Sequence, residues 1–115
     1  MNAQEFAEVV ELLKSKDAMT YEDGYFSLLG NVDRYLAELV ALMQAEAEPS
    51  MRGKYIELLG DCSTKEVIPI LEAELSSSHR EVRFWAYSQL AHNDHPEAKE
   101  ISRKYKEDNP NEDWY

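Results

Sequence analysis

The chain has 115 residues, of which 43% are hydrophobic, with four glycines and four prolines. The apolar residues are numerous enough to form the core of one compact domain, and the glycines and prolines are too few for the linker and loops of a second domain. Its 23 acidic and 12 basic side chains give a formal net charge of -11, which would repel phosphate backbones and makes a nucleic acid a poor partner. No stretch approaches the roughly 18 apolar residues of a membrane span, so no membrane association is expected.

Cys62 is the single cysteine of the chain and cannot form an internal disulfide bond. It follows a predicted turn, and no lysine or histidine beside it would lower the pKa of its thiol, so we expect a small structural residue rather than a nucleophile. A lone cysteine fits a reducing compartment. Together with the absence of a signal peptide at the first residues, this favours a cytoplasmic protein.

The first predicted elements are three helices. Apolar residues recur at the spacing of an amphipathic helix over residues 2–16. Thr20 is placed to cap a second helix that runs to Leu29, and Gly30 is expected to end it in the left-handed conformation. A long third helix should follow directly, and Pro49 should end it because proline cannot continue the hydrogen-bond ladder.

The second half of the chain predicts further helices. One covers residues 51–60. The next two should begin at Ser63 with Glu66 and at Ser78 with Glu81, because each pair has the S-x-x-E spacing of a capping box. Their buried faces should contain Val67, Ile68, Leu71, Leu75, Val82, Ala86 and Leu90.

The last predicted helix begins near Pro96 and is mostly polar, as suits an element that covers one end of a stack. No segment alternates apolar and polar residues for the length of a strand. The sequence therefore predicts an all-α fold.

An internal repeat with a period of about 31 residues runs through these helices. It is visible in residues 25–30, 55–60 and 86–91, which read YFSLLG, YIELLG and AYSQLA. Each copy is a short helix that ends near a glycine or alanine, a polar turn and a second helix. A lone copy could not bury its apolar face, so the copies are expected to stack.

Residues 51–91 resemble the HEAT repeat, in the short form that is also found in bilin lyases. Arg52 opens the first helix, Leu59-Gly60 closes it, and the second helix contains Ile68-Pro69-Ile70-Leu71. The match is weaker before this segment, where Glu22 stands in place of the arginine, and after it. The resemblance implies a short right-handed α-solenoid of about three HEAT-like helical hairpins plus an N-terminal helix, which binds proteins along a concave face lined by the second helices.

We expect one such domain over residues 1–107, followed by an acidic C-terminal tail over residues 108–115. The common catalytic signatures are absent from the sequence. His92 and His95 are close enough to contribute to a transition-metal site, but no third ligand stands at a recognisable spacing, and an inter-helix turn is the plainer interpretation. We therefore predict no enzyme activity, no catalytic residues, no cofactor and no metal, and the scaffold repeat does not imply lyase activity.

Two features remain for binding a partner. Glu38, Glu66 and Glu72 fall away from the apolar stripes of their helices, and in a HEAT-like stack they would point toward the concave side. A solvated face is the plainer alternative. The tail ends in Asp113, Trp114 and Tyr115, and because exposed aromatic rings are costly in water, these residues should either fold back over the last helix or contact a partner.

Two functions fit these observations. The first is a small acidic module that binds a basic protein, most concretely a bacterial immunity protein that neutralises a nuclease-type toxin, since such an inhibitor must complement a surface built for phosphate. The second is a HEAT-repeat scaffold or adaptor that binds a cellular protein or peptide without inhibiting it. For the scaffold, an exposed region around Phe84 and Trp85 and the tail would matter more than the carboxylates. Added salt should weaken only charge-driven binding steeply.

Overall fold

The computed structural model describes residues 1–112 and residue 114, and this part of the chain forms helices and no strand. The predicted all-α class is therefore confirmed. None of these helices combines the length and hydrophobicity that crossing a bilayer requires. In chain order the helices are α1 (Ala3–Leu13), α2 (Ala18–Leu29), α3 (Leu36–Ala45), α4 (Pro49–Leu59), α5 (Val67–Glu74), α6 (Arg80–His92) and α7 (Pro96–Asp108).

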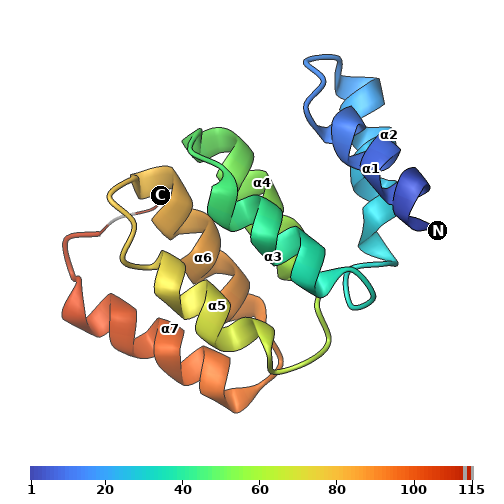
Figure 1. Cartoon of the computed structure of the whole chain (residues 1–115). Coiled ribbons are helices and arrows are strands. Elements are labelled where there is room, and N and C mark those ends of the chain that lie inside the picture. The colour runs from blue at the N-terminus through green and yellow to red at the C-terminus, as the bar shows by residue number, and fades with distance from the viewer. Residues whose placement is uncertain (113, 115) are drawn as a thin grey trace.

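The helices stack in two rows (Figure 1). α4 and α6 pack against each other, α3 packs against α4, and α6 packs against both α5 and α7. Figure 1 shows α3, α5 and α7 in front of α4 and α6. α1 and α2 pair with each other at the N-terminal end of the stack. The molecule measures 42 × 27 × 22 Å along its principal axes, an elongation that suits a solenoid-like array.

The core lies between the two rows and is centred on α4. Four of its side chains, Tyr55, Ile56, Leu58 and Leu59, are at most 2% exposed. The apolar periodicity of the other helices predicted most of their buried positions, although Val9, Leu36 and Leu42 of the same stripes are only half-buried. Among the predicted positions that are buried are Phe6, Val10, Leu13, Leu39, Met43, Val67, Leu71, Val82, Ala86 and Leu90.

α2 differs from its prediction at both ends. Its cap is Asp17 rather than Thr20, and the Asp17 carboxylate accepts a hydrogen bond from the Thr20 backbone N–H at 3.0 Å. Gly30 has φ of -79° and is not left-handed. Residues 31–35 continue in turns before α3 begins, so the third helix does not follow Gly30 directly.

The prediction that Pro49 ends the third helix is wrong, because Pro49 is the first residue of α4. A proline at this position leaves no helical hydrogen bond unmade, since the first N–H groups of a helix have no acceptor within it. Glu48 caps the helix: its carboxylate accepts from the backbone N–H groups of Ser50 at 3.1 Å and Met51 at 2.8 Å. The proline therefore marks a helix start.

The predicted capping box of Ser63 and Glu66 does not form. α5 begins at Val67, and Glu66, which precedes it, makes no capping hydrogen bond with its side chain. Ser63 instead binds a distant partner: its backbone N–H donates to Asp33 Oδ1 at 2.8 Å, and its hydroxyl donates to Oδ2. A carboxylate from the preceding repeat has replaced the local cap.

The second predicted capping box, of Ser78 and Glu81, does not form either. α6 begins at Arg80, and the preceding His79 makes no capping hydrogen bond with its side chain. The Glu81 carboxylate accepts a hydrogen bond from the Ser50 hydroxyl at 3.1 Å, which links the starts of α6 and α4. Contacts between repeats again decide the partners of these polar side chains.

Candidate functional site

One face of the molecule carries three consecutive grooves between the helices α1, α3, α5 and α7. The α1–α3 groove has a volume of about 480 Å³, the α3–α5 groove about 610 Å³ and the α5–α7 groove about 470 Å³. Residues of α3 line the first two grooves and residues of α5 line the last two. The grooves therefore form one continuous surface, which we call the second-helix face.

The three carboxylates predicted from the sequence lie on the second-helix face. Glu38 and Glu66 line the α3–α5 groove, and Glu72 lines the α5–α7 groove. All three are exposed. Within residues 1–112 and residue 114, none of them forms an ion pair. These carboxylates are therefore available to a cation from outside the chain.

The surroundings of these carboxylates are also acidic. Asp33 adds another carboxylate to the α3–α5 groove, where Arg34 is the basic lining residue. Hydrogen bonds from Ser63 hold the pKa of Asp33 below its usual value. In the α5–α7 groove, Glu100 and Asp108 join Glu72 against Lys104. Both grooves thus have an excess of negative charge, which attracts cations.

The α1–α3 groove has a different character, because most of its exposed lining is apolar. Phe6 and Val10 of α1 face Leu42 of α3 across it, and the Phe6 ring stacks on Tyr35 with centroids 4.4 Å apart. Sequence reasoning did not identify this groove. Leu42 belongs to the apolar stripe of α3, but because α1 pairs with α2, Leu42 is only half-buried beside α1.

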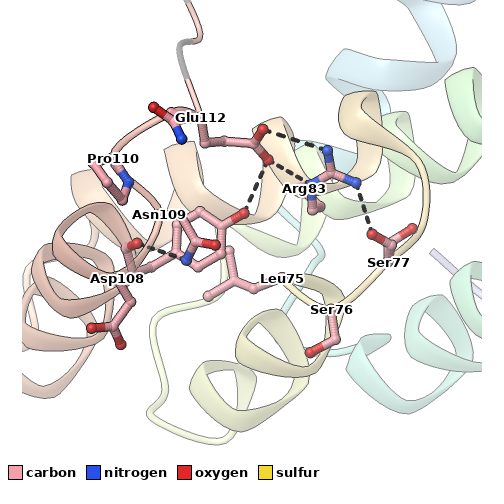
Figure 2. Close-up of a pocket in the computed structure, with 10 residues that line it drawn as sticks. Leu75, Ser76, Ser77, Arg83, Asp108, Asn109, Pro110 and Glu112 are labelled. Carbon is pink, nitrogen blue, oxygen red and sulfur yellow. Dashed lines mark hydrogen bonds and ion pairs between the residues drawn. The ribbon is translucent and has the colours of Figure 1, made fainter.

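Figure 2 shows a further pocket, of about 530 Å³, where the C-terminal segment returns to the array. The Glu112 carboxylate accepts hydrogen bonds from Arg83 Nε at 2.6 Å and from the Tyr105 hydroxyl at 3.0 Å. Arg83 Nη1 also donates to the Ser77 carbonyl at 2.9 Å. The Arg83 guanidinium lowers the pKa of the Glu112 carboxyl. The pair fastens the segment after α7 to α6.

Trp114 adds a second attachment, because its ring lies in an aromatic cluster. Its centroid is 5.7 Å from that of Phe84, 5.9 Å from Tyr87 and 6.5 Å from Tyr105. The Arg80 guanidinium lies 5.3 Å from the Trp114 centroid, a distance at which a cation is attracted to the face of an indole. The ring is therefore held by α6 and α7 together.

These contacts bear on one position of the predicted tail. Trp114 folds back over α6 and α7, which is one of the two outcomes expected for it, whereas Asp113 and Tyr115 lie outside the described residues. The expected exposed region around Phe84 and Trp85 is wrong: both rings are half-buried, and they pack edge to face with centroids 5.2 Å apart. Phe84 is covered because Trp114 packs against it.

Arg52, the arginine on which the HEAT resemblance depends, has a structural environment. Its Nε and Nη2 donate to the two carboxylate oxygens of Glu74 at 2.7 and 2.9 Å, and its Nη1 donates to the Glu46 carbonyl at 3.1 Å. Both side chains of the pair are largely buried. Glu74 raises the pKa of the guanidinium further. The pair links α4 to α5 rather than to a ligand.

His92, His95 and Cys62 have contacts within the chain that give them structural surroundings. His92 Nδ1 lies 2.7 Å from the Ser88 carbonyl, and His95 Nε2 lies 3.3 Å from the Ser63 carbonyl. In the part of the chain that the structure describes, no three histidine, cysteine or carboxylate side chains are grouped so that they could hold a metal ion. Cys62 is 5% exposed, and burial raises the pKa of its thiol.

A family model of HEAT repeats matches residues 36–113, which is more than half of the chain. This confirms the resemblance predicted from residues 51–91 and extends it on both sides, from the start of α3 into the C-terminal segment. Neither a curated protein nor a solved structure shows significant similarity to the chain.

Proposed function

The chain belongs to the HEAT repeat family, and we propose that it is a module that binds a basic protein through the carboxylates of its second-helix face. The observation that carries this proposal is the position of Glu38, Glu66 and Glu72, which line adjacent grooves and form no ion pair within the described part of the chain. A surface of this charge would accelerate association with a positively charged partner.

The lack of ion-pair partners for these carboxylates within the described part of the chain favours the free energy of binding. A lysine or arginine of the partner could approach Glu66 without displacing a cation of the chain itself. Glu97, in contrast, is paired with Lys65 at 3.2 Å, so a partner would have to compete for its carboxylate. Exposed ion pairs contribute little individually. Several carboxylates on one face are therefore needed for useful affinity and for a strong dependence on salt.

The most specific form of the proposal is an immunity protein that neutralises a nuclease-type bacterial toxin in the cytoplasm. A nuclease needs lysine and arginine side chains to bind phosphate, and a chain with a net charge of -11 complements such a surface. Inhibition of this kind requires the acidic face to cover the toxin's basic site. It requires no reaction by the inhibitor.

Substitution of the three carboxylates tests the proposed face. We expect the full-length variant Glu38→Gln, Glu66→Gln, Glu72→Gln to bind the basic partner about tenfold or more weakly, because the loss of steering charges slows association. The matched control removes the same charge from α1 and α2 as Glu5→Gln, Glu8→Gln, Glu22→Gln. Equal weakening of both variants, measured by surface plasmon resonance at low salt, would show that net charge acts and that the face does not.

The alternative function, a scaffold that binds an apolar segment without inhibition, is favoured by the α1–α3 groove. Its lining is mostly apolar, and Ala41 lies in it as an exposed residue of α3. If this groove is the binding site, Ala41→Lys should abolish capture of the partner while the three glutamine substitutions leave it unchanged. Binding should then persist in high salt, because apolar contact is not screened.

A further inference from the structure

We propose that the C-terminal end of the array is a peptide-binding site for an acidic and aromatic sequence of the form Glu-x-Trp, and that the chain's own Glu112 and Trp114 occupy it. Arg83 is the receptor for the carboxylate, and the rings of α6 and α7 are the receptor for the indole. This goes beyond the proposed function, because the ligand is acidic rather than basic and is held by Arg83, Phe84 and Tyr87 of α6, which do not line the second-helix face.

Comparison of two repeat arginines shows that the site is built for a carboxylate. Arg52 and Arg83 occupy equivalent positions at the starts of α4 and α6. The Nη1 group of Arg52 donates to the Glu46 carbonyl, and that of Arg83 donates in the same way to the Ser77 carbonyl. In both arginines, Nε and Nη2 donate to the two oxygens of a single carboxylate. The repeat therefore presents the same anion receptor twice.

The source of the carboxylate differs between the two copies. Arg52 receives Glu74 from the next helix, α5. The position one repeat later, on α7, is Tyr105, whose side chain is a phenol and has no carboxylate. The hydroxyl of Tyr105 instead donates to Glu112 at 3.0 Å. The carboxylate that binds Arg83 thus comes from the segment after the last helix. A free peptide could supply a carboxylate in the same way.

Trp114 makes the interaction specific for more than charge. Its ring contacts aromatic side chains of both α6 and α7, and Arg80 lies over its face. The chain as a whole is strongly negative, but Arg80 and Arg83 of α6 place two positive charges at this end of the array. They provide a local site for an acidic ligand. Two anchors, one anionic and one aromatic, together form a short recognition sequence.

The connection between α7 and the first anchor is short and exposed. Residues 109–111 are exposed, and the Glu112 backbone N–H bonds to the Asn109 carbonyl at 3.0 Å. Because the segment is covalently attached, its effective concentration at the site is high and it would exclude a free peptide. A peptide of the same chemistry should bind only when the anchors are removed or displaced.

The experiment uses the full-length chain carrying Glu112→Ala and Trp114→Ala, and a fluorescein-labelled peptide with the sequence of residues 109–115, NPNEDWY. We expect the double variant to bind the peptide at least tenfold more tightly than the unmodified chain, as measured by fluorescence anisotropy. Addition of Arg83→Gln to the double variant should abolish this binding. A control peptide in which glutamine replaces the glutamate and alanine replaces the tryptophan should not bind.

Two results would overturn the proposal: a folded double variant that binds the peptide no better than the unmodified chain, or one that binds the control peptide equally well. Circular dichroism verifies the fold. If the double variant loses its helices, the single variant Glu112→Gln, which keeps Trp114, replaces it. That variant should show a smaller gain in peptide affinity that still depends on Arg83, and no gain would refute the proposal equally.

Discussion

Burial decides what each arginine ion pair contributes to this molecule. The Arg52 and Glu74 side chains are 24% and 10% exposed, whereas Arg103 and its partner Glu100 are 60% and 63% exposed. Both arginines bind carboxylates with good geometry. A buried carboxylate that loses its cation stays desolvated, which raises the free energy of the folded state. An exposed carboxylate that loses its cation is hydrated instead.

We therefore expect Arg52→Ala to lower the free energy of unfolding by about 2–3 kcal/mol, because Glu74 would remain largely buried without a cation. Arg103→Ala, the matched control, should cost far less, because the carboxylates it leaves behind stay in water. Urea denaturation followed by circular dichroism measures both values. A similar cost for the two variants would contradict the structural role of the Arg52–Glu74 pair.

Glu112 gives a prediction about pH. Arg83 holds the pKa of this carboxyl below its ordinary value of 4.5, so the folded state binds the proton less readily than the unfolded state. The stabilisation is thus present above pH 4.5 and is lost as the pH falls below it. The unmodified chain should be more stable than Glu112→Gln at pH 7, and the difference in free energy of unfolding should shrink steadily below pH 4.5. A difference that is constant from pH 7 to pH 3 would show that the ion pair does not stabilise the fold.

Residue-level signals in the sequence were only partly sufficient. Pro49 and the two S-x-x-E pairs are real local preferences, but a proline fits both after a helix and at its first turn. Ser63 found a better partner in Asp33 of the preceding repeat. Sequence separation hides such partners, so the failure of the two S-x-x-E capping boxes could not be foreseen from local spacing.

At the scale of the elements, the close approach of α4 and α6 depends on a glycine. A Cβ atom built on Gly53 would lie 2.6 Å from Cδ1 of Trp85. The Trp85 ring also packs against Phe84, so it cannot shift freely. α4 and α6 can therefore approach each other closely at Gly53, because glycine has no side chain there.

We expect Gly53→Ala to destabilise the protein by roughly 1–3 kcal/mol, because overpacking outweighs the gain of about 1 kcal/mol in helix propensity. Gly30→Ala is the control, since its Cβ would meet nothing within 4 Å and its backbone is right-handed. It should be neutral or stabilise by up to about 1 kcal/mol. Thermal unfolding of both variants distinguishes these outcomes, and a stabilised Gly53→Ala would contradict the packing of α4 on α6.

The helices themselves were predicted well from apolar periodicity. The buried faces of α5 and α6 match the predicted positions, because these faces depend on a spacing that the sequence shows directly. The half-burial of Leu42 was missed since it depends on how α1 pairs with its neighbours. Periodicity identifies an apolar face but not the helix that covers it.

At the scale of the whole molecule, the repeat predicted the family and the stacking of helices, and the HEAT match over residues 36–113 agrees with it. It did not identify the C-terminal pocket. The equivalence of Arg52 and Arg83 was visible in the sequence as a pair of arginines one repeat apart, and the absence of a second glutamate at position 105 could have indicated that the last copy needs an anion from elsewhere.

The net charge of -11 is likewise a property of the whole chain and says little about a site until the carboxylates are placed. Glu38, Glu66 and Glu72 were selected because they leave the apolar stripes of their helices, and they line the α3–α5 and α5–α7 grooves. Their role in binding stays a prediction. Ion pairing elsewhere on the surface could not be read from the sequence, because it depends on contacts such as that of Lys65 with Glu97.

The most direct measurement is a pull-down from the source cells at low and at high salt, with the unmodified chain, the second-helix-face variant and the α1–α2 control variant as baits, and with bound proteins identified by mass. We predict that a basic protein is recovered at low salt with the unmodified chain and the control, is lost at high salt, and is lost at both salts with the second-helix-face variant. Recovery of a nuclease domain would support the immunity function specifically. Recovery of the same partner by all three baits, undiminished in high salt, would contradict the proposed charge-driven face.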